Sequence, residues 1–322
     1  MSADLSSENY TENTAAPAPH HLAVPPACAG LRLDQALAQL LPQYSRARLT
    51  TWIRDGRVTV DGSPAAPRAK IHGGEQIIVQ PALSPEETAY RPEVIPLTVV
   101  YQDDTLMVIN KPAGLVVHPG SGNWQGTLLN ALLAHAPQLA TVPRAGIVHR
   151  LDKDTSGLLV IAMTLTAQTD LVRQLQARTV SREYRAVVHG QVKRNGKMEG
   201  PIGRDPRSRI RMAVTAKGKP AVTHYTVLEK FAHASVLACR LETGRTHQIR
   251  VHLQKLGFPI WGDPVYRARN APAKSTLTPL ITRQALHAEK LALTHPQTGE
   301  TMRWQAALPD DMLQLIATLR AA

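Results

Sequence analysis

The spacing of apolar residues changes along the chain, from helical periodicity near the N-terminus to short strand-like runs beyond residue 95. Between residues 31 and 56 the apolar positions recur every three or four residues, which predicts two short helices. From residue 96 onward, short apolar runs bounded by Gly, Pro, Asn and Asp outnumber helical segments, and many connections are short. The pattern therefore predicts an α+β protein, with a mixed, largely antiparallel β-sheet core behind a small module of a helix pair and strands.

The composition divides the chain into four segments. Residues 1–27 are rich in Ala, Pro, Ser and Thr and lack periodicity, so we expect a disordered tail there. Residues 28–81 hold the helix pair and short strands. Residues 82–95 have two prolines, an acidic pair and no period, which indicates a linker, and residues 96–322 form the larger core.

The helix pair predicts a compact basic module. Leu33 and Leu37 lie at helical spacing in the first helix. Ser45 suits the N-cap of the second helix, and Gly56 suits its C-terminal end. Arginines cluster on or beside the helices, as expected of a surface that contacts phosphates: Arg46, Arg48, Arg54 and Arg57.

The charge balance favours a polyanion as partner. The formal net charge is +12 and the isoelectric point is about 10.0, although a solvated basic surface gives the same numbers. Aromatic residues make up only 4%, which disfavours single-strand binding on stacking platforms. No apolar run reaches the roughly 20 residues of a membrane helix, and the N-terminus lacks the pattern of a secretory signal. Cys28 and Cys239 are too few for a disulfide framework. We therefore expect a cytoplasmic protein without a membrane segment.

The densest set of chemically useful side chains lies at residues 146–157, just before an apolar run. Asp152 and Asp154 stand there among His149, Arg150 and Lys153. Nearby positive charge favours an ionised carboxylate, which a nucleophile or general base requires. From these residues alone, a salt-bridged structural loop is an equally good interpretation.

Several motifs together resemble known RNA-modifying enzymes. Residues 31–62 resemble an S4 RNA-binding domain. The sequence HRLDKDTSG at 149–157 resembles the signature of RluA-type pseudouridine synthases, stand-alone enzymes that modify ribosomal and transfer RNA. The family's other motifs follow in the expected order: NKPAG at 110–114 with VHPG at 117–120, SREYRA at 181–186, TGRTHQIRVH at 243–252, GDPVY at 262–266 and RQALH at 283–287. The S4-like module makes the branch that acts on large-subunit ribosomal RNA the most similar one.

The resemblance implies roles for individual residues. Asp152 matches the family's catalytic aspartate, which either attacks the sugar or removes a proton from it. Tyr184 matches the tyrosine that stacks on the target base and assists removal of the C5 proton, and Arg250 matches the basic partner of the aspartate. Arg150 would fill the space left by the flipped uridine. The remaining RNA contacts are expected from Arg245, His247 and the four module arginines.

The same resemblance implies the partners. RNA is the expected substrate, namely 23S ribosomal RNA in the large ribosomal subunit or its precursor, with the helix 69 stem-loop as the favoured target. We expect a monomer that needs no metal and no cofactor. Met163 departs from the family pattern, which often has a lysine there, and this puts one basic contact in doubt.

Two alternatives remain open from the sequence. One is a non-catalytic RNA-binding or ribosome-assembly factor that retains a degenerate synthase domain; the intact set of Asp152, Tyr184 and Arg250 speaks against it. The other is an RNA methyltransferase. The glycine-rich residues 120–126 are not followed by a convincing βαβ pattern, so no nucleotide- or cofactor-binding loop supports the second alternative.

Overall fold

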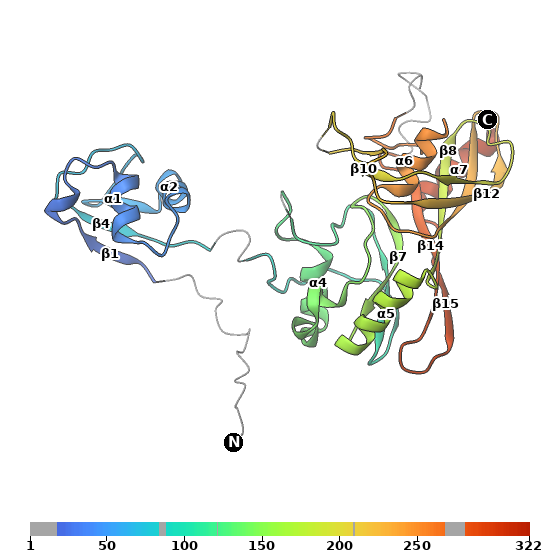
Figure 1. The fold of residues 1–322 in the computed structure, drawn as a ribbon, viewed down its shortest axis with the longest axis horizontal. Helices are drawn as coiled ribbons and strands as arrows, with labels where there is room; N and C mark the ends of the chain where they lie inside the picture. Colours follow the sequence, from blue (N-terminus) through green and yellow to red (C-terminus); the bar gives the residue numbers. More distant parts are fainter. Residues whose placement is uncertain (1–17, 84–87, 121, 209, 268–280) are drawn as a thin grey trace. The chain divides into compact units, whose positions relative to one another are not determined.

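The structure is a computed structural model, and it describes residues 18–83, 88–120, 122–208, 210–267 and 281–322. The chain divides between Thr88 and Ala89 into two compact units (Figure 1). Each unit has a hydrophobic core of its own, so each can position its functional side chains independently.

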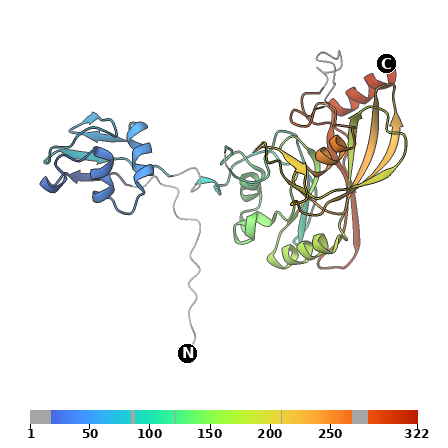
Figure 2. The same ribbon diagram turned by 45° about the horizontal axis from the view of Figure 1, so that its top comes forward.

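The N-terminal unit packs two helices against a small antiparallel sheet, as Figures 1 and 2 show. The strand order is β1-β4-β2-β3. Its elements are β1 (His20–Ala23), the short 3-10 helix η1 (Pro26–Cys28), α1 (Leu33–Leu40), α2 (Arg46–Arg54), β2 (Val58–Val60), β3 (Ser63–Pro64) and β4 (Gln76–Val79).

The helix pair forms where the sequence predicts it. The Ser45 hydroxyl caps α2 by accepting a hydrogen bond from the backbone N–H of Arg48 at 3.3 Å. Gly56 follows the helix with a φ of 71°, a left-handed conformation that glycine adopts without strain. Leu33, Leu37 and Leu49 are fully buried. The predicted helices and their apolar faces are confirmed.

The tail prediction extends too far along the chain. His20–Ala23 forms the edge strand β1, which pairs antiparallel with β4 and places His21 opposite Ile78. Val24 and Cys28 are buried in the module core. The physical reason is that the edge of β4 needs a hydrogen-bonding partner, and this short segment supplies one. Residues 1–17, which belong to the same prediction, lie outside the described residues.

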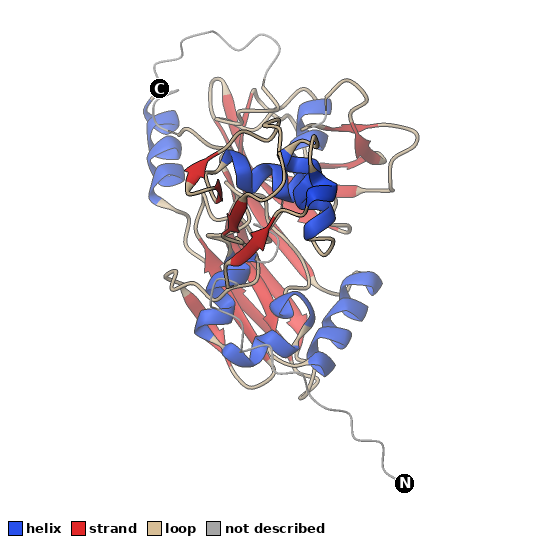
Figure 3. Cartoon of the chain, turned by 90° about the vertical axis from the view of Figure 1, so that its left-hand side faces the viewer, coloured by secondary structure: helices blue, strands red, loops and turns tan. Residues whose placement is uncertain are grey.

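The larger unit is built around a long mixed sheet, shown from the side in Figure 3. Its strand order is β5-β6-β7-β14-β8-β13-β12-β9, with β15 pairing to β14. All of these pairs are antiparallel except β14 with β7. The α+β class with a largely antiparallel sheet is therefore confirmed. The elements are β5 (Val99–Gln102), β6 (Leu106–Lys111), α4 (Leu128–His135), η2 (Pro137–Thr141), η3 (Pro143–Gly146), β7 (Ser156–Ala162), α5 (Leu165–Ala177), β8 (Ser181–His189), β9 (Gly196–Glu199), β10 (Ile202–Arg204), β11 (Met212–Val214), β12 (Val222–Lys230), β13 (Ala234–Leu241), α6 (Gln248–Lys255), β14 (Leu286–Thr294), β15 (Thr301–Gln305) and α7 (Asp310–Ala321).

Strand β7 is buried on both of its faces, which explains its unbroken apolar run. Leu158 and Val160 share a core cluster with Leu171 of α5. Leu159 belongs to another cluster together with Leu132 of α4. Alternate residues of a strand point to opposite faces, so α4 and α5 cover the two sides of β7. The loop before this strand is thereby anchored to the core of the larger unit.

The predicted linker is shorter than residues 82–95. Ala89 is buried, and the Asn130 side-chain amide donates to the carbonyls of Ala89 at 2.9 Å and Arg91 at 2.8 Å. The backbone N–H of Glu93 donates to the Asn130 carbonyl at 3.0 Å. Residues 89–95 are therefore part of the larger unit, because α4 holds their backbone through a single buried asparagine.

Gly157 shows why the motif at 149–157 ends in glycine. Its φ is 115°, and a Cβ atom at this position would lie within 2.3 Å of the Ala288 carbonyl oxygen. Only glycine fits this approach of β14 to β7. The close contact at this end of the motif is thus with the protein's own backbone rather than with a ligand.

Candidate active site

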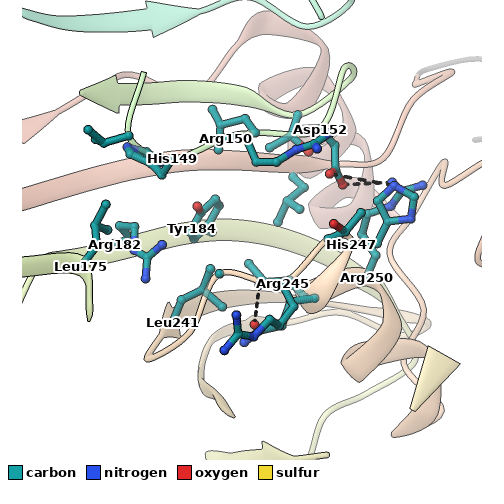
Figure 4. Close-up of a pocket in the computed structure, with 18 of the residues that line it drawn as sticks. His149, Arg150, Asp152, Leu175, Arg182, Tyr184, Leu241, Arg245, His247 and Arg250 are labelled. Carbon is teal, nitrogen blue, oxygen red and sulfur yellow. Dashed lines mark hydrogen bonds and ion pairs between the residues drawn. The ribbon is translucent and has the colours of Figure 1, made fainter. Parts of the chain in front are cut away.

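Sequence-distant segments of the larger unit surround a pocket of about 300 Å³ (Figure 4). The loop before β7 contributes Asp152, the start of β8 contributes Tyr184, and the loop leading into α6 contributes His247. Arg250 reaches the pocket from the first turn of α6. The three motifs that resemble catalytic motifs therefore converge on one cavity.

A chain of ion pairs holds Asp152 in this pocket. The Nη1 atom of Arg250 lies 3.0 Å from Oδ2 of Asp152. On its other side, Arg250 donates from Nε and Nη2 to the two oxygens of Asp263 at 2.7 and 2.9 Å. Asp263 is fixed in turn, because its Oδ1 accepts the backbone N–H groups of Val265 and Tyr266 at 2.8 and 2.9 Å. Such a bidentate pair leaves the guanidinium little freedom.

Burial and neighbouring charges shift the pKa values of Arg250 and Asp263 in opposite directions. Burial by itself lowers the pKa of Arg250, but the hydrogen bonds and charges of Asp263 and Asp152 outweigh it and raise the pKa above the ordinary value. Burial raises the pKa of Asp263, but the hydrogen bonds and charge of Arg250, together with the backbone N–H groups of Tyr266 and Val265, lower it below its ordinary value. The pair therefore stays charged, and Arg250 presents a permanent positive charge to Asp152.

His247 also lies near the Asp152 carboxylate. Its Nε2 atom is 3.9 Å from Oδ1 of Asp152, and its Nδ1 atom is 2.8 Å from the Tyr266 hydroxyl. That hydroxyl accepts the Met212 backbone N–H at 2.7 Å, and its own proton can be donated to Nδ1. Burial lowers the pKa of His247. A neutral ring that accepts the Tyr266 proton at Nδ1 carries its own proton on Nε2, facing Asp152.

Tyr184 faces the same pocket from the centre of the sheet. On β8 it lies opposite Cys239 of β13 and Ala288 of β14, and only 5% of its surface is exposed. Burial raises the pKa of its hydroxyl, which keeps the group protonated near neutral pH. Among the described residues, no side chain or backbone group forms a hydrogen bond with this hydroxyl. It is thus available to a ligand.

Residues of the NKPAG motif form hydrogen bonds with the backbone of the Asp152 loop. Lys111 is fully buried, and its Nζ donates to the carbonyls of Pro112, Leu115 and Lys153 at 2.8, 3.0 and 2.9 Å. The N–H of Gly114 donates to the same Lys153 carbonyl at 2.9 Å. Burial lowers the pKa of Lys111 to about 7. The NKPAG motif therefore fixes the residue next to Asp152.

The remaining predicted contacts lie in two places. Arg150 and Arg245 line the pocket and are exposed, as expected of side chains that meet RNA. Within the N-terminal unit, Arg54 and Arg57 are exposed. Arg46 is also exposed, but it forms an ion pair with the buried Asp34 at 2.7 Å.

Arg48 has a structural role as well. Its guanidinium lies 5.1 Å from the centre of the Trp52 ring and donates to the Ala82 carbonyl at 3.0 Å. Arg46 and Arg48 therefore stabilise the module in addition to any contact with RNA.

The sequence reasoning missed two residues of the pocket region. Asp263 was part of the GDPVY motif, but its role as anchor of Arg250 depends on contacts across 13 residues. Arg182 was part of the SREYRA motif and lines the pocket while being only 7% exposed. The position of Arg182 two residues before Tyr184 on a strand was the one available signal, because such residues share a face.

The described part of the chain contains no group of three or more His, Cys, Asp or Glu side chains that could hold a metal ion. His252 shows how a histidine of the basic motif is used instead. Its ring nitrogens are bonded to the Thr223 hydroxyl at 2.9 Å and the Gly200 carbonyl at 3.0 Å. Among the described helices, none is long and apolar enough to cross a membrane.

Both units of the chain match known RNA-related families. Residues 105–255 match the RNA pseudouridylate synthase family, and residues 31–77 match the S4 domain. The chain belongs to the pseudouridine synthases: it is 58% identical, over 301 residues, to the ribosomal large subunit pseudouridine synthase D of Nitrosomonas europaea, covering 93% of this chain and 87% of that protein.

Other relatives agree with this assignment. The enzyme of the same name from Neisseria meningitidis serogroup B is 54% identical, covering 98% of this chain and 85% of its own length. Among solved structures, the human RNA pseudouridylate synthase domain-containing protein 4 is 26% identical with a TM-score of 0.55, covering 69% of this chain and 93% of that chain. The resemblance found in the motifs is therefore confirmed over most of the chain.

Proposed function

We propose that this pseudouridine synthase isomerises uridine in the 23S ribosomal RNA of the large ribosomal subunit or its precursor, with Asp152 as the catalytic carboxylate. The observation that carries the assignment of the residue is the ion pair between Asp152 and Arg250 inside the pocket. Asp154, the other carboxylate of the motif, forms no ion pair within the part of the chain that the structure describes.

The chemistry breaks the bond between C1′ and N1, turns the uracil, and joins C1′ to C5. Asp152 either attacks the sugar or removes a proton from it, and its conjugate acid can return a proton later. Arg250 stabilises the carboxylate before the reaction and directs it, because Asp263 holds the guanidinium in place. A fixed charge that needs no reorganisation is the most effective kind of electrostatic support.

Tyr184 supplies the surface on which the base lies. Its buried ring and unpartnered hydroxyl support stacking on the uracil and assistance in removing the proton from C5. Because burial raises the pKa of the hydroxyl, the group is not a phenolate, and it accepts the C5 proton only while it passes its own proton to another group. The exposed Arg150 and Arg245 at the pocket contact the surrounding RNA, and Arg150 occupies the place of the extruded base.

The N-terminal module gives affinity and choice of site. Its exposed Arg54 and Arg57 suit phosphate contacts. We assign residues 18–83 to this module and residues 89–322 to the catalytic domain, since Asn130 ties residues 89–91 to the latter. The enzyme works as a cytoplasmic monomer in this proposal, because its RNA substrate is made there and the pocket is formed by one chain.

The names of the relatives point to the large ribosomal subunit, and we propose the helix 69 stem-loop as the target. Carbodiimide-primed reverse transcription of ribosomal RNA from cells with and without the gene tests this directly. A pseudouridine stop in that stem-loop, lost in the cells without the gene, is the expected result. Loss of a stop elsewhere would correct the target, and unchanged stops throughout would contradict the function.

A further inference from the structure

Arg182 stands out among the buried cations of the catalytic domain. Only 7% of its surface is exposed, yet within the described ranges its side chain has neither an anion nor a hydrogen-bond acceptor as partner. Its Nε atom is closed to solvent and unsatisfied. By contrast, Arg185 on the other face of the same strand donates to both oxygens of Glu289 at 2.9 and 2.8 Å.

A buried cation without a partner is costly, because burial removes its hydration and nothing replaces it. The other buried basic groups described above have partners: Arg250 has two aspartates, and Lys111 has three carbonyls. A ligand that brings an anion or a hydrogen-bond acceptor would supply the missing partner. The side chain of Arg182 lines the pocket, so the partner is expected to enter there.

His149, which lines the same pocket, also has a buried ring nitrogen without a hydrogen-bond partner among the described residues. Its Nε2 atom accepts the backbone N–H of Val160 at 3.3 Å. Burial and the Arg182 charge lower its pKa to about 3, so the ring is neutral and its proton must sit on Nδ1. That Nδ1 atom is buried and has no partner among the described residues. The ligand at this end of the pocket must therefore offer acceptors.

Gly244 keeps the space that the guanidinium occupies. A Cβ atom at this position would lie 2.9 Å from Nη1 of Arg182. The φ angle of Gly244 is not in the left-handed region, so its own backbone does not require glycine. A side chain at 244 would therefore make the Arg182 guanidinium shift from its position.

Figure 4 shows Arg182 and His149 at one end of the pocket and Asp152 with Arg250 at the other, with Tyr184 between them. We propose that Arg182 binds a backbone phosphate of the RNA next to the flipped uridine, while Asp152 works on its sugar. This rests on the proposed function. A phosphate fits because it brings a full negative charge and only acceptors, and because guanidinium binds it in a bidentate manner. A uracil edge is neutral and presents a donor as well.

The test uses a synthetic stem-loop that contains the mapped uridine, with one neutral methylphosphonate linkage at each nearby position in turn. Wild-type protein should lose about tenfold or more in affinity at one linkage. Arg182→Gln should lose the same factor on unmodified RNA and show no further loss at that linkage. Losses that add at every linkage, or an Arg182→Gln variant with wild-type affinity, would overturn the proposal.

Three further variants separate ligand binding from a structural role. Arg182→Lys keeps the charge and should recover part of the affinity. Gly244→Ala keeps every charge but displaces the guanidinium, so it should weaken binding at the same linkage. Arg173→Gln removes a charge from an exposed position of α5 outside the pocket and should leave the linkage effect intact. Wild-type affinity in Gly244→Ala, or loss of the linkage effect in Arg173→Gln, would contradict the assignment to Arg182.

Stability without RNA gives an independent readout. Because Arg182 has no protein partner to lose, Arg182→Gln should unfold at the same temperature as the wild type or a higher one. A clear drop in melting temperature with unchanged affinity would show a structural residue and contradict the proposal. The function itself is tested separately by tritium release from C5-labelled RNA. Absence of release by the wild type, combined with coupling at one linkage, would refute the isomerase role and leave the phosphate site standing.

Discussion

Arg250 and Asp152, which are 98 residues apart in sequence, meet at 3.0 Å in the pocket. The contact depends on a third residue, because Asp263 holds the opposite edge of the guanidinium. The carboxylate that we assign to catalysis is thus aimed by a side chain that is itself fixed. This relationship leads to predictions for the residues that form these ion pairs.

Asp263→Asn should damage both stability and turnover. The amide replaces one carboxylate oxygen by an NH₂ group that faces the donors of Arg250, and the buried charge loses its main partner. Breaking such a buried pair costs about 3–5 kcal/mol, measurable by urea unfolding. Glu229→Gln, which alters a pair with the exposed Arg320, is the control and should change little. Wild-type stability and rate in Asp263→Asn would show that Arg250 does not need this anchor.

Tyr184→Phe separates the ring from the hydroxyl. The variant keeps the stacking surface, so RNA binding and cleavage of the glycosidic bond should survive. Release of the C5 proton should slow by about a hundredfold or more, in line with the loss of a general acid–base group. Single-turnover measurements of tritium release and of base detachment distinguish the steps. Equal losses in Tyr184→Phe and Tyr184→Ala at every step would contradict a role in which the ring alone supports binding.

His287 should make the fold sensitive to acid. Burial lowers its pKa from 6.5 to about 4, and Ser156 lies 2.9 Å from its Nδ1 atom. Between pH 6.5 and 4 the unfolded chain binds a proton that the folded chain rejects. The free energy of unfolding therefore falls as the pH falls through this window, by up to about 1.4 kcal/mol per pH unit from this group.

Urea unfolding at several pH values tests this, with His287→Gln expected to have a shallower pH dependence than the wild type. His118 and His149, whose pKa values burial lowers to about 4 and about 3, should retain the rest of the slope. The exposed His135→Gln is the matched control. An unchanged slope in His287→Gln would show that this ring does not resist protonation.

A protein that starts at Thr88 should fold and retain catalysis. The cut leaves Ala89 and Arg91 in place, whose carbonyls Asn130 binds. Apparent RNA affinity should fall, and the salt dependence should flatten by roughly one unit of slope per lost phosphate contact. Modification rates measured against RNA and salt concentration check this. Unchanged affinity, slope and site choice would reduce the module to a structural appendage.

The elements with long apolar patterns could be predicted from the sequence, and the short or context-dependent ones could not. The helices around Leu37 and Leu49 and the buried strand at Leu158 follow from local periodicity. Strand β1 has only four residues in a Pro- and Ala-rich segment, and its existence depends on the free edge of β4. The attachment of Ala89 depends likewise on Asn130, 41 residues away.

Some residues of the site could likewise be predicted from the sequence, and others could not. Asp152, Tyr184 and Arg250 lie in dense motifs, so the resemblance to a family located them. Arg182 could not be found this way, because what distinguishes it from the other arginines is the lack of a partner. That property depends on every side chain that surrounds it in three dimensions, including the bare position at Gly244.

The central claim is that Asp152 carries the isomerisation. The most direct test is tritium release from C5-labelled ribosomal RNA by Asp152→Asn, which keeps the shape of the side chain and removes its charge. We predict a fall in turnover of at least about a thousandfold, with RNA affinity nearly unchanged and a much milder effect in Asp154→Asn. Release at the wild-type rate by Asp152→Asn would contradict the account.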